Sequence, residues 1–258
     1  MRRTPEEYSA VALEVAREAA ALVLGGFRSR PRTTPKRHAE IVTEFDLLSE
    51  RLIRARLAER TPEVAVVAEE EGGQAGPGLT WYCDPIDGTT NFAHGHPFWC
   101  VSIGLCEGGR PLAGAVVAPV LGIEWWNVEG GAAFRSGETC RVSETPRLED
   151  ALVATGFPSD RSTAPHNNFD AFARVKRRVQ GVRRCGSAAM DVCLVADGTY
   201  DAYWERALCT WDIAGGAAIA LAAGARITAL DGSAVDLSVG HVLVSNGRLH
   251  DALVGLVG

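Results

Sequence analysis

Four acidic residues of this sequence stand where a strand or a turn is expected to end. They are Glu69, Asp84, Asp87 and Asp212, and the first three are close neighbours in the sequence. Clustered carboxylates repel one another unless a positive charge neutralises them, so such a group favours a divalent cation. The potential ligands are all oxygens, including the Ile86 carbonyl, and therefore suit Mg²⁺, Mn²⁺ or Ca²⁺ rather than Zn²⁺.

The segment Asp84–Phe92, DPIDGTTNF, holds most of this chemistry. Pro85 fixes φ and ends the preceding strand, and Gly88 permits a backbone conformation or a close approach that a side chain would forbid. The order Asp-Gly-Thr-Thr at 87–90 is typical of a helix start, where the free N–H groups of Gly88 and Thr89 favour phosphate. Metal-binding acids beside such amides point to phosphoester hydrolysis by two or more metals.

Each of these segments also has a purely structural interpretation. The D-P-x-D turn could carry surface acids at the end of a strand, Glu69–Glu71 could be a solvated run of charge, and Asp212 could cap the helix that follows it. The metal hypothesis therefore depends on all of these features occurring together.

The elements that must position these residues follow from periodicity and turn residues. Apolar residues at three-and-four spacing predict a helix over 5–27, and Thr43 is the expected N-cap of a second helix over 45–57. Residues 29–39 are polar, hold two prolines and are expected to form a loop. Apolar runs punctuated by glycine and proline predict strands at 64–67, 79–83, 99–106, 111–118, 122–126 and 132–135.

Strands and helices alternate in the remainder of the chain. We expect strands at 152–155, 200–204, 225–229 and 242–244, and helices at 168–180, 188–196, 211–223 and from 249 onward. This order fits two layered halves joined near 144–148, namely residues 1–145, which carry most of the acids, and residues 146–258, which complete one functional unit.

Composition excludes several classes of protein. The chain has 258 residues, of which 47% are hydrophobic and 22% charged, as is usual for a globular enzyme. Its net charge of −6 argues against a direct nucleic-acid partner. We expect no signal peptide and no membrane span, because no apolar stretch is long enough. Seven scattered cysteines without a C-x-x-C pair predict reduced thiols and a cytoplasmic location.

Two motifs together resemble the signatures of the inositol monophosphatase family. DPIDGTTNF at Asp84–Phe92 is similar to the first signature and WDIAGG at Trp211–Gly216 to the second. Other blocks agree in order and spacing, and they are Ile41–Asp46, Val67–Glu70, Gly130–Gly137 with Arg141–Ser143, and Gly186–Ala189. The resemblance covers the chain from about Thr43 to its C-terminus.

The resemblance implies an α/β (α+β) fold, a layered α-β-α-β-α sandwich, in a protein that is commonly a homodimer, Mg²⁺-dependent and lithium-sensitive. It implies that two or three Mg²⁺ ions, which Mn²⁺ can replace, bind Glu69, Asp84, the Ile86 carbonyl, Asp87 and Asp212. Glu69 and Thr89, the latter hydrogen-bonded to Asp46, would activate the attacking water. The implied substrate-binding residues are Asp87, Gly88, Thr89, Gly186, Ser187, Ala188, Glu205 and Asp212.

The expected activity is Mg²⁺-dependent hydrolysis of a small phosphate monoester, foremost inositol 1-phosphate. Histidinol phosphate and fructose 1,6-bisphosphate are alternative substrates on the same fold. A non-enzymatic alternative is a protein-binding role in transcription or RNA processing, against which the complete set of metal ligands argues.

Six further positions carry expectations. Ala68 replaces the family's usual glycine with little expected effect, and Pro35 falls where the family has a lysine, which leaves the role of Lys36 in doubt. Arg183 and Arg184 are expected to be exposed or in a dimer contact. Arg206 follows Glu205 and could reach the substrate.

Overall fold

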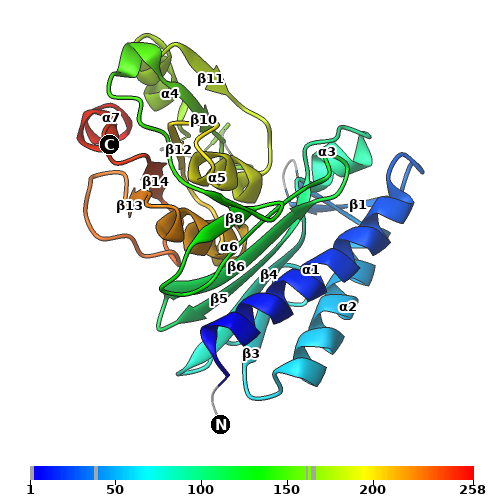
Figure 1. The fold of residues 1–258 in the computed structure, drawn as a ribbon. Coiled ribbons are helices and arrows are strands. Elements are labelled where there is room, and N and C mark those ends of the chain that lie inside the picture. Colours follow the sequence, from blue (N-terminus) through cyan, green and yellow to red (C-terminus); the bar gives the residue numbers. More distant parts are fainter. Residues whose placement is uncertain (1–2, 38–39, 161, 164–166) are drawn as a thin grey trace.

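The computed structural model describes residues 3–37, 40–160, 162–163 and 167–258. Five layers follow one another in space, with helices α1 and α2 outside a large sheet, α5 and α6 between two sheets, and α4 and α7 outside the second sheet (Figure 1). The predicted α-β-α-β-α sandwich is thus confirmed. None of the described helices is long and apolar enough to cross a membrane.

The outer helices α1 (Pro5–Gly26) and α2 (Glu44–Arg60) both begin with a capping box. In α1 the Thr4 hydroxyl accepts from the Glu7 amide at 3.3 Å, and the Glu7 carboxylate accepts from the Thr4 amide at 2.8 Å. These bonds satisfy N–H groups that have no partner within the helix. The apolar stripe of α1 packs with Ile53 and Leu57 of α2 against the large sheet and forms the first core.

The large sheet has seven strands in the order β3-β4-β5-β6-β7-β8-β9. Its strands are β3 (Ala65–Ala68), β4 (Leu79–Asp87), β5 (Cys100–Glu107), β6 (Arg110–Ala118), β7 (Ile123–Asn127), β8 (Ala133–Arg135) and β9 (Glu138–Cys140). β3 lies parallel to β4, and every later strand is antiparallel to its neighbour. The ends of β3 and β4 therefore meet at one edge, from which the short helix α3 (Thr89–Ala93) starts.

The central layer consists of α5 (Ala188–Ala196) and α6 (Thr210–Ala222), whose small apolar residues are buried on nearly every side. A helix that is apolar all round is typical of the interior. These helices pack between the two sheets and form the second core. Because α6 also packs against β5 and β6, residues on both sides of position 145 share this core. The division into halves at 145 and 146 stays a prediction.

The second sheet has five strands in the order β11-β10-β12-β14-β13, and they are β11 (Gly181–Arg183), β10 (Leu152–Thr155), β12 (Ala202–Glu205), β14 (Val242–Ser245) and β13 (Arg226–Thr228). β10 lies parallel to both β11 and β12. A 3₁₀ turn at Leu148–Asp150 precedes β10, and α4 (Phe169–Lys176) and α7 (His250–Val257) cover the outer face over a third core.

The loop expected over 29–39 was wrong for residues 33–37, whereas residues 38 and 39 lie outside the described part of the chain. Residues Thr33–Arg37 form β1, which pairs antiparallel with β2 (Glu40–Thr43) and is shifted in register after Pro35. Nothing apolar alternates in β1, so period-two patterning could not reveal it. Strands β9 and β11 were also unexpected, because each has only three residues and no alternating apolar pattern.

Candidate active site

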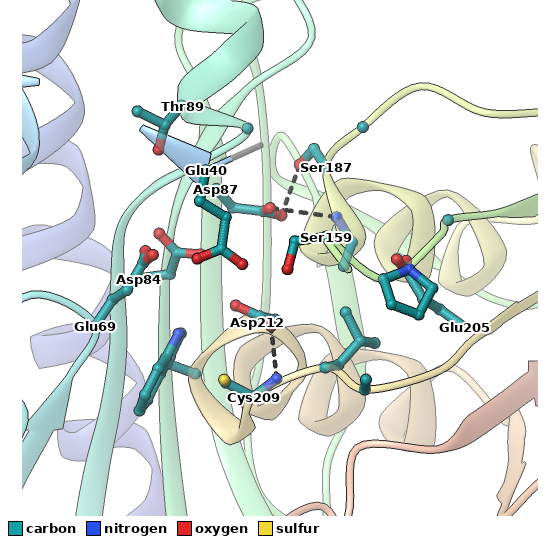
Figure 2. A pocket seen from close by; sticks show the side chains of 18 of the residues that line it. Glu40, Glu69, Asp84, Asp87, Thr89, Ser159, Ser187, Glu205, Cys209 and Asp212 are labelled. Atoms are coloured by element: carbon teal, nitrogen blue, oxygen red, sulfur yellow. Dashed lines mark hydrogen bonds between the residues drawn. The ribbon is translucent and has the colours of Figure 1, made fainter. Parts of the chain in front are cut away.

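A cavity of about 400 Å³ lies where the end of β4, the start of α3 and the N-termini of α5 and α6 approach one another. Figure 2 shows the carboxylates of Glu69, Asp84, Asp87 and Asp212 pointing toward one another across it. Glu69 directly follows β3, and Asp84 and Asp87 lie on the neighbouring β4, where the pairing with β5 shifts register between the two. The structure therefore brings together all four predicted acids and the Ile86 backbone.

Each of three carboxylates is held by a backbone or side-chain donor. Asp84 accepts from the Ile86 amide at 3.0 Å, and Asp212 accepts from the Cys209 amide at 2.7 Å as part of the cap of α6. Asp87 accepts from the Ser187 hydroxyl at 2.7 Å and from the Ala189 and Ala188 amides at 2.7 and 3.3 Å. Asp87 thus also satisfies the N-terminus of α5, although it lies far from that helix in sequence.

Burial and mutual repulsion act on these carboxylates. Loss of water, followed by repulsion from Glu69, Asp87 and Asp212, raises the pKa of Asp84 well above its ordinary value. Burial and then repulsion from Asp87 and Glu69 do the same to the pKa of Asp212, and burial raises the pKa of Asp87 to about 6. A divalent cation would remove this repulsion.

The donor set fits a hard cation, because it consists of carboxylate oxygens and one backbone carbonyl. Within residues 3–37, 40–160, 162–163 and 167–258, no group of three or more His, Cys, Asp or Glu side chains has the arrangement of a formed metal site. The oxygens line a common cavity and carry the unfavourable repulsion that a cation relieves, and on these two grounds the residues fit a hard divalent cation.

Thr89, the first residue of α3, lies beside the acids. Its hydroxyl is 2.9 Å from Asp46 Oδ1 and 3.0 Å from the Ile86 carbonyl. Asp46 is fully buried, accepts from the Thr43 amide at 2.7 Å and hydroxyl at 2.5 Å, and has its pKa raised to about 6 chiefly by burial. The cap of α2 therefore fixes the partner of Thr89.

Gly88 precedes α3 with φ of +96°, in the left-handed region. A Cβ there would lie 3.1 Å from the carbonyl oxygens of both Gly186 and Phe98. Glycine meets both demands, and it lets the N-terminal amides of α3 line the cavity. The predicted phosphate contacts Gly88 and Thr89 are thus side by side in the cavity wall.

The remaining predicted substrate residues form the other end of the cavity. Gly186, Ser187 and Ala188 lead into α5, and Glu205 ends β12. Glu205 accepts a short hydrogen bond from the Tyr203 hydroxyl, and burial raises its pKa to about 7. Its carboxylate lies against Gly156, where a Cβ would be 2.0 Å from either oxygen.

Lys36, Arg184 and Asp191 are among the cavity residues that lay outside the predicted site. Lys36 on β1 contacts Glu69 and Glu70, with Nζ–O distances of 2.9 Å to each. Arg184 is exposed but lines the cavity, and Asp191 lines it with a buried Oδ1 that has no partner within the described parts of the chain. Lys36 had a weak signal, as one of only two lysines, whereas nothing local marked Asp191.

The expectation that Arg206 reaches the substrate was wrong. Its guanidinium donates to the Val257 carbonyl at 2.6 Å and lines a separate small cavity with Arg174. Arg206 is the first residue after β12, and its contact with the C-terminal end of α7 holds it away from the cavity that Glu205 lines.

Comparison with known proteins gives a consistent result. The profile of the inositol monophosphatase family matches residues 4–257. An inositol-1-monophosphatase of Synechocystis is 41% identical over 219 residues, 84% of this chain and 76% of that protein. The Nus factor SuhB of Pseudomonas aeruginosa is 36% identical over 95% of this chain and 93% of its own length. A solved inositol monophosphatase from Anabaena superposes with a TM-score of 0.90 at 34% identity, over 98% of this chain and 95% of that one.

Proposed function

Because this chain belongs to the inositol monophosphatase family and is a phosphoric monoester hydrolase, we propose that it hydrolyses a small polyol phosphate, foremost inositol 1-phosphate, with Mg²⁺. The observation that carries the proposal is the convergence of four carboxylates on one cavity beside the Thr89–Asp46 pair; one directly follows β3, two lie on β4 and one lies on α6. The Synechocystis relative is named for inositol 1-phosphate, which supports that compound as the substrate.

Glu69, Asp84, the Ile86 carbonyl, Asp87 and Asp212 would hold two or three Mg²⁺ ions, which Mn²⁺ can replace. When bound, Mg²⁺ supplies charge that favours ionisation of water and stabilises the leaving alkoxide. The repulsion among Asp84, Asp87 and Asp212 supports this assignment, since the cation removes an unfavourable interaction already present in the fold.

The chain's own residues orient the reactants. Since the Thr89 hydroxyl can donate to Asp46, its lone pairs are free to accept a hydrogen bond from one O–H of the attacking water and so orient it. Glu69, held by Lys36, would accept the water's other proton. The N-terminal amides of α3, at Gly88 and Thr89, would bind the phosphate oxygens.

The alcohol would bind at the opposite end of the cavity. The carboxylates of Glu205 and Asp212 are acceptors for its hydroxyl groups, and Gly186, Ser187 and Ala188 form the adjacent wall. Absence of a side chain at Gly186 leaves room there, and its φ of +89° suits glycine.

The test is phosphate release by the purified protein from inositol 1-phosphate, histidinol phosphate and fructose 1,6-bisphosphate, with Mg²⁺ and after chelation by EDTA. We expect Mg²⁺-dependent release that is fastest from inositol 1-phosphate. A preference for either of the other two would transfer the substrate assignment to it. Release that persists undiminished in EDTA would contradict the metal assignment.

A second function has one observation in its favour, the Nus factor name of the Pseudomonas relative. It would be a protein-binding role in transcription. Capture of RNA polymerase by the wild type and by an Asp212→Asn variant would support this role. Failure of the wild type and of the variant to bind polymerase would contradict it.

Membership of the family also leads us to infer a homodimer, lithium inhibition and a cytoplasmic location. The seven cysteines are all free thiols, which suits a reducing compartment. Light scattering of the purified protein tests the dimer, and a lithium titration of the phosphatase assay tests inhibition.

A further inference from the structure

Two neighbouring strand ends form the alcohol end of the cavity. β10 ends at Thr155 and is followed by Gly156, while β12 ends with Trp204 and Glu205. Thr155 and Trp204 are register partners in this parallel pair. Because the Glu205 carboxylate lies directly on Gly156, its position depends on how these two strand ends are held together.

Asn168 joins the two strand ends with every atom of its carboxamide. Its Nδ2 donates to Thr155 Oγ1 at 2.9 Å and to the Gly156 carbonyl at 2.6 Å, while its Oδ1 accepts from Trp204 Nε1 at 2.8 Å. Thr155 Oγ1 in turn donates to the Trp204 carbonyl at 2.6 Å. Thr155, Asn168 and Trp204 thus form a closed hydrogen-bonded ring, called here the strand-end clamp.

The backbone of Asn168 has an uncommon conformation. Its φ is +75°, in the left-handed region, where asparagine is one of the few tolerated residues besides glycine. The side chain is 4% exposed and makes no cap to α4, although the residue occupies the N-cap position of that helix. The carboxamide makes no hydrogen bond to its own helix, and both its N–H donor and its oxygen bond to β10, Gly156 and β12 instead.

We propose that Asn168 is a positioning residue for the alcohol end of the site, acting through Gly156 and Glu205. The inference rests on the proposed function. Asn168 is not among the described residues of the cavity wall, so it has no contact with a substrate there. It holds the Gly156 carbonyl and the residue before Glu205, and thereby sets where the Glu205 carboxylate meets the hydroxyl groups of the alcohol.

The experiment compares two substrates in Asn168→Gly, which keeps the backbone conformation accessible and removes the clamp. One substrate is inositol 1-phosphate, and the other is 4-nitrophenyl phosphate, whose leaving group offers no hydroxyl to Glu205. We expect KM for inositol 1-phosphate to rise about tenfold, while kcat/KM for 4-nitrophenyl phosphate stays within about twofold. Asn167→Ala, which removes only a side chain that accepts from the Phe169 amide, is the matched control and should leave both unchanged.

A double-mutant cycle with Glu205→Gln tests whether the effect passes through Glu205. In that background Asn168→Gly should raise KM for inositol 1-phosphate no more than about twofold further. Asn168→Asp, which retains the acceptor for Trp204 but loses the donor to Gly156, serves as a second variant with the same expected substrate split should the glycine variant fold poorly.

Equal slowing of both substrates by a folded variant, or a full effect in the Glu205→Gln background, would overturn the inference and leave the proposed function intact. A wild-type protein inactive on both substrates would overturn the proposed function and this inference with it. The two failures are therefore distinguished by the wild-type rates alone.

Discussion

Asp84 and Asp87 differ in what surrounds them, although they are three residues apart on one strand. Asp87 accepts three hydrogen bonds at the start of α5, so its removal would harm both the cavity and the fold. Among the residues that the structure describes, Asp84 accepts only from the nearby Ile86 amide, and other carboxylates repel it. Asp84 is therefore the position at which metal binding and folding can be separated.

Asp84→Asn should lower kcat by at least about 100-fold, because a neutral amide is a poor ligand for Mg²⁺. The same change should raise the melting temperature of the metal-free protein, since it removes one of the repelling charges. Phosphate release and thermal unfolding in EDTA provide the two measurements. Near-normal turnover, or a lower melting temperature without metal, would contradict the assignment of Asp84.

Thr89 offers a test of the water-orienting hydroxyl. Thr89→Ser keeps the hydroxyl near Asp46 and should retain activity within about tenfold, whereas the isosteric Thr89→Val should lose about 100-fold or more in kcat. Steady-state kinetics at saturating Mg²⁺ measure both. If serine and valine variants behaved alike, the methyl group and not the hydroxyl would be the important part of this side chain.

At the scale of elements, α6 is placed by two glycines on neighbouring strands. Gly104 of β5 and Gly114 of β6 are register partners, and a Cβ on either would lie 2.4 or 2.1 Å from the backbone of Gly215. This close approach brings the first turn of α6, and with it Asp212, against the large sheet. This contact therefore helps to place Asp212 of the WDIAGG segment near the acids of the DPIDGTTNF segment.

Gly114→Ala should push α6 from the sheet, lower the free energy of unfolding by about 3 kcal/mol, and reduce kcat/KM by about tenfold or more as Asp212 moves. Denaturant unfolding and kinetics measure these effects. Gly25→Ala in α1 is the matched control, because a Cβ there meets nothing within 4 Å and alanine favours a helix. A Gly114→Ala variant as stable and active as Gly25→Ala would show that α6 has room to adjust.

At the scale of the whole molecule, a buried histidine joins α7 of the outer layer to strands β13 and β14 of the second sheet. His250 Nε2 is 2.8 Å from the Thr228 hydroxyl and its Nδ1 is 2.8 Å from the Ser245 hydroxyl. Burial, with a smaller contribution from Arg226 against that of Asp251, lowers the pKa of His250 to about 4. The folded protein therefore prefers neutral His250, whereas the unfolded chain takes up a proton near pH 6.5.

The contribution of His250 to stability is complete above about pH 6.5 and is lost as the pH falls toward 4. Between pH 7 and pH 5 it should lower the free energy of unfolding by about 1 to 2 kcal/mol. His250→Gln should remove this part of the pH dependence, and His94→Gln, at an exposed position, is the control. Identical pH dependence of stability in the wild type and His250→Gln would exclude this role.

The fold and the acids could be predicted because their signals are local. Pro85, Gly88 and the acids of DPIDGTTNF lie within one turn, and the Thr43 cap fixes Asp46 from three residues away. Their geometry follows from adjacent dihedral angles and helix-end hydrogen bonds. From β5 to β8 the strands of the large sheet likewise follow one another as antiparallel neighbours joined by short turns that glycine and proline punctuate.

Lys36, Arg184, Asp191 and Asn168 acquire their surroundings only when elements distant in sequence pack together. Lys36 meets Glu69 because the polar strands β1 and β2 pair beside the site, and Asn168 meets Trp204 because β10 and β12 are parallel neighbours. By itself the sequence determined which groups could bind a hard cation and a phosphate, through contacts short along the chain. The packing of five layers decided which side chains orient those groups and shape the alcohol end, because a polar side chain carries no local sign of the partner that a distant strand will bring to it.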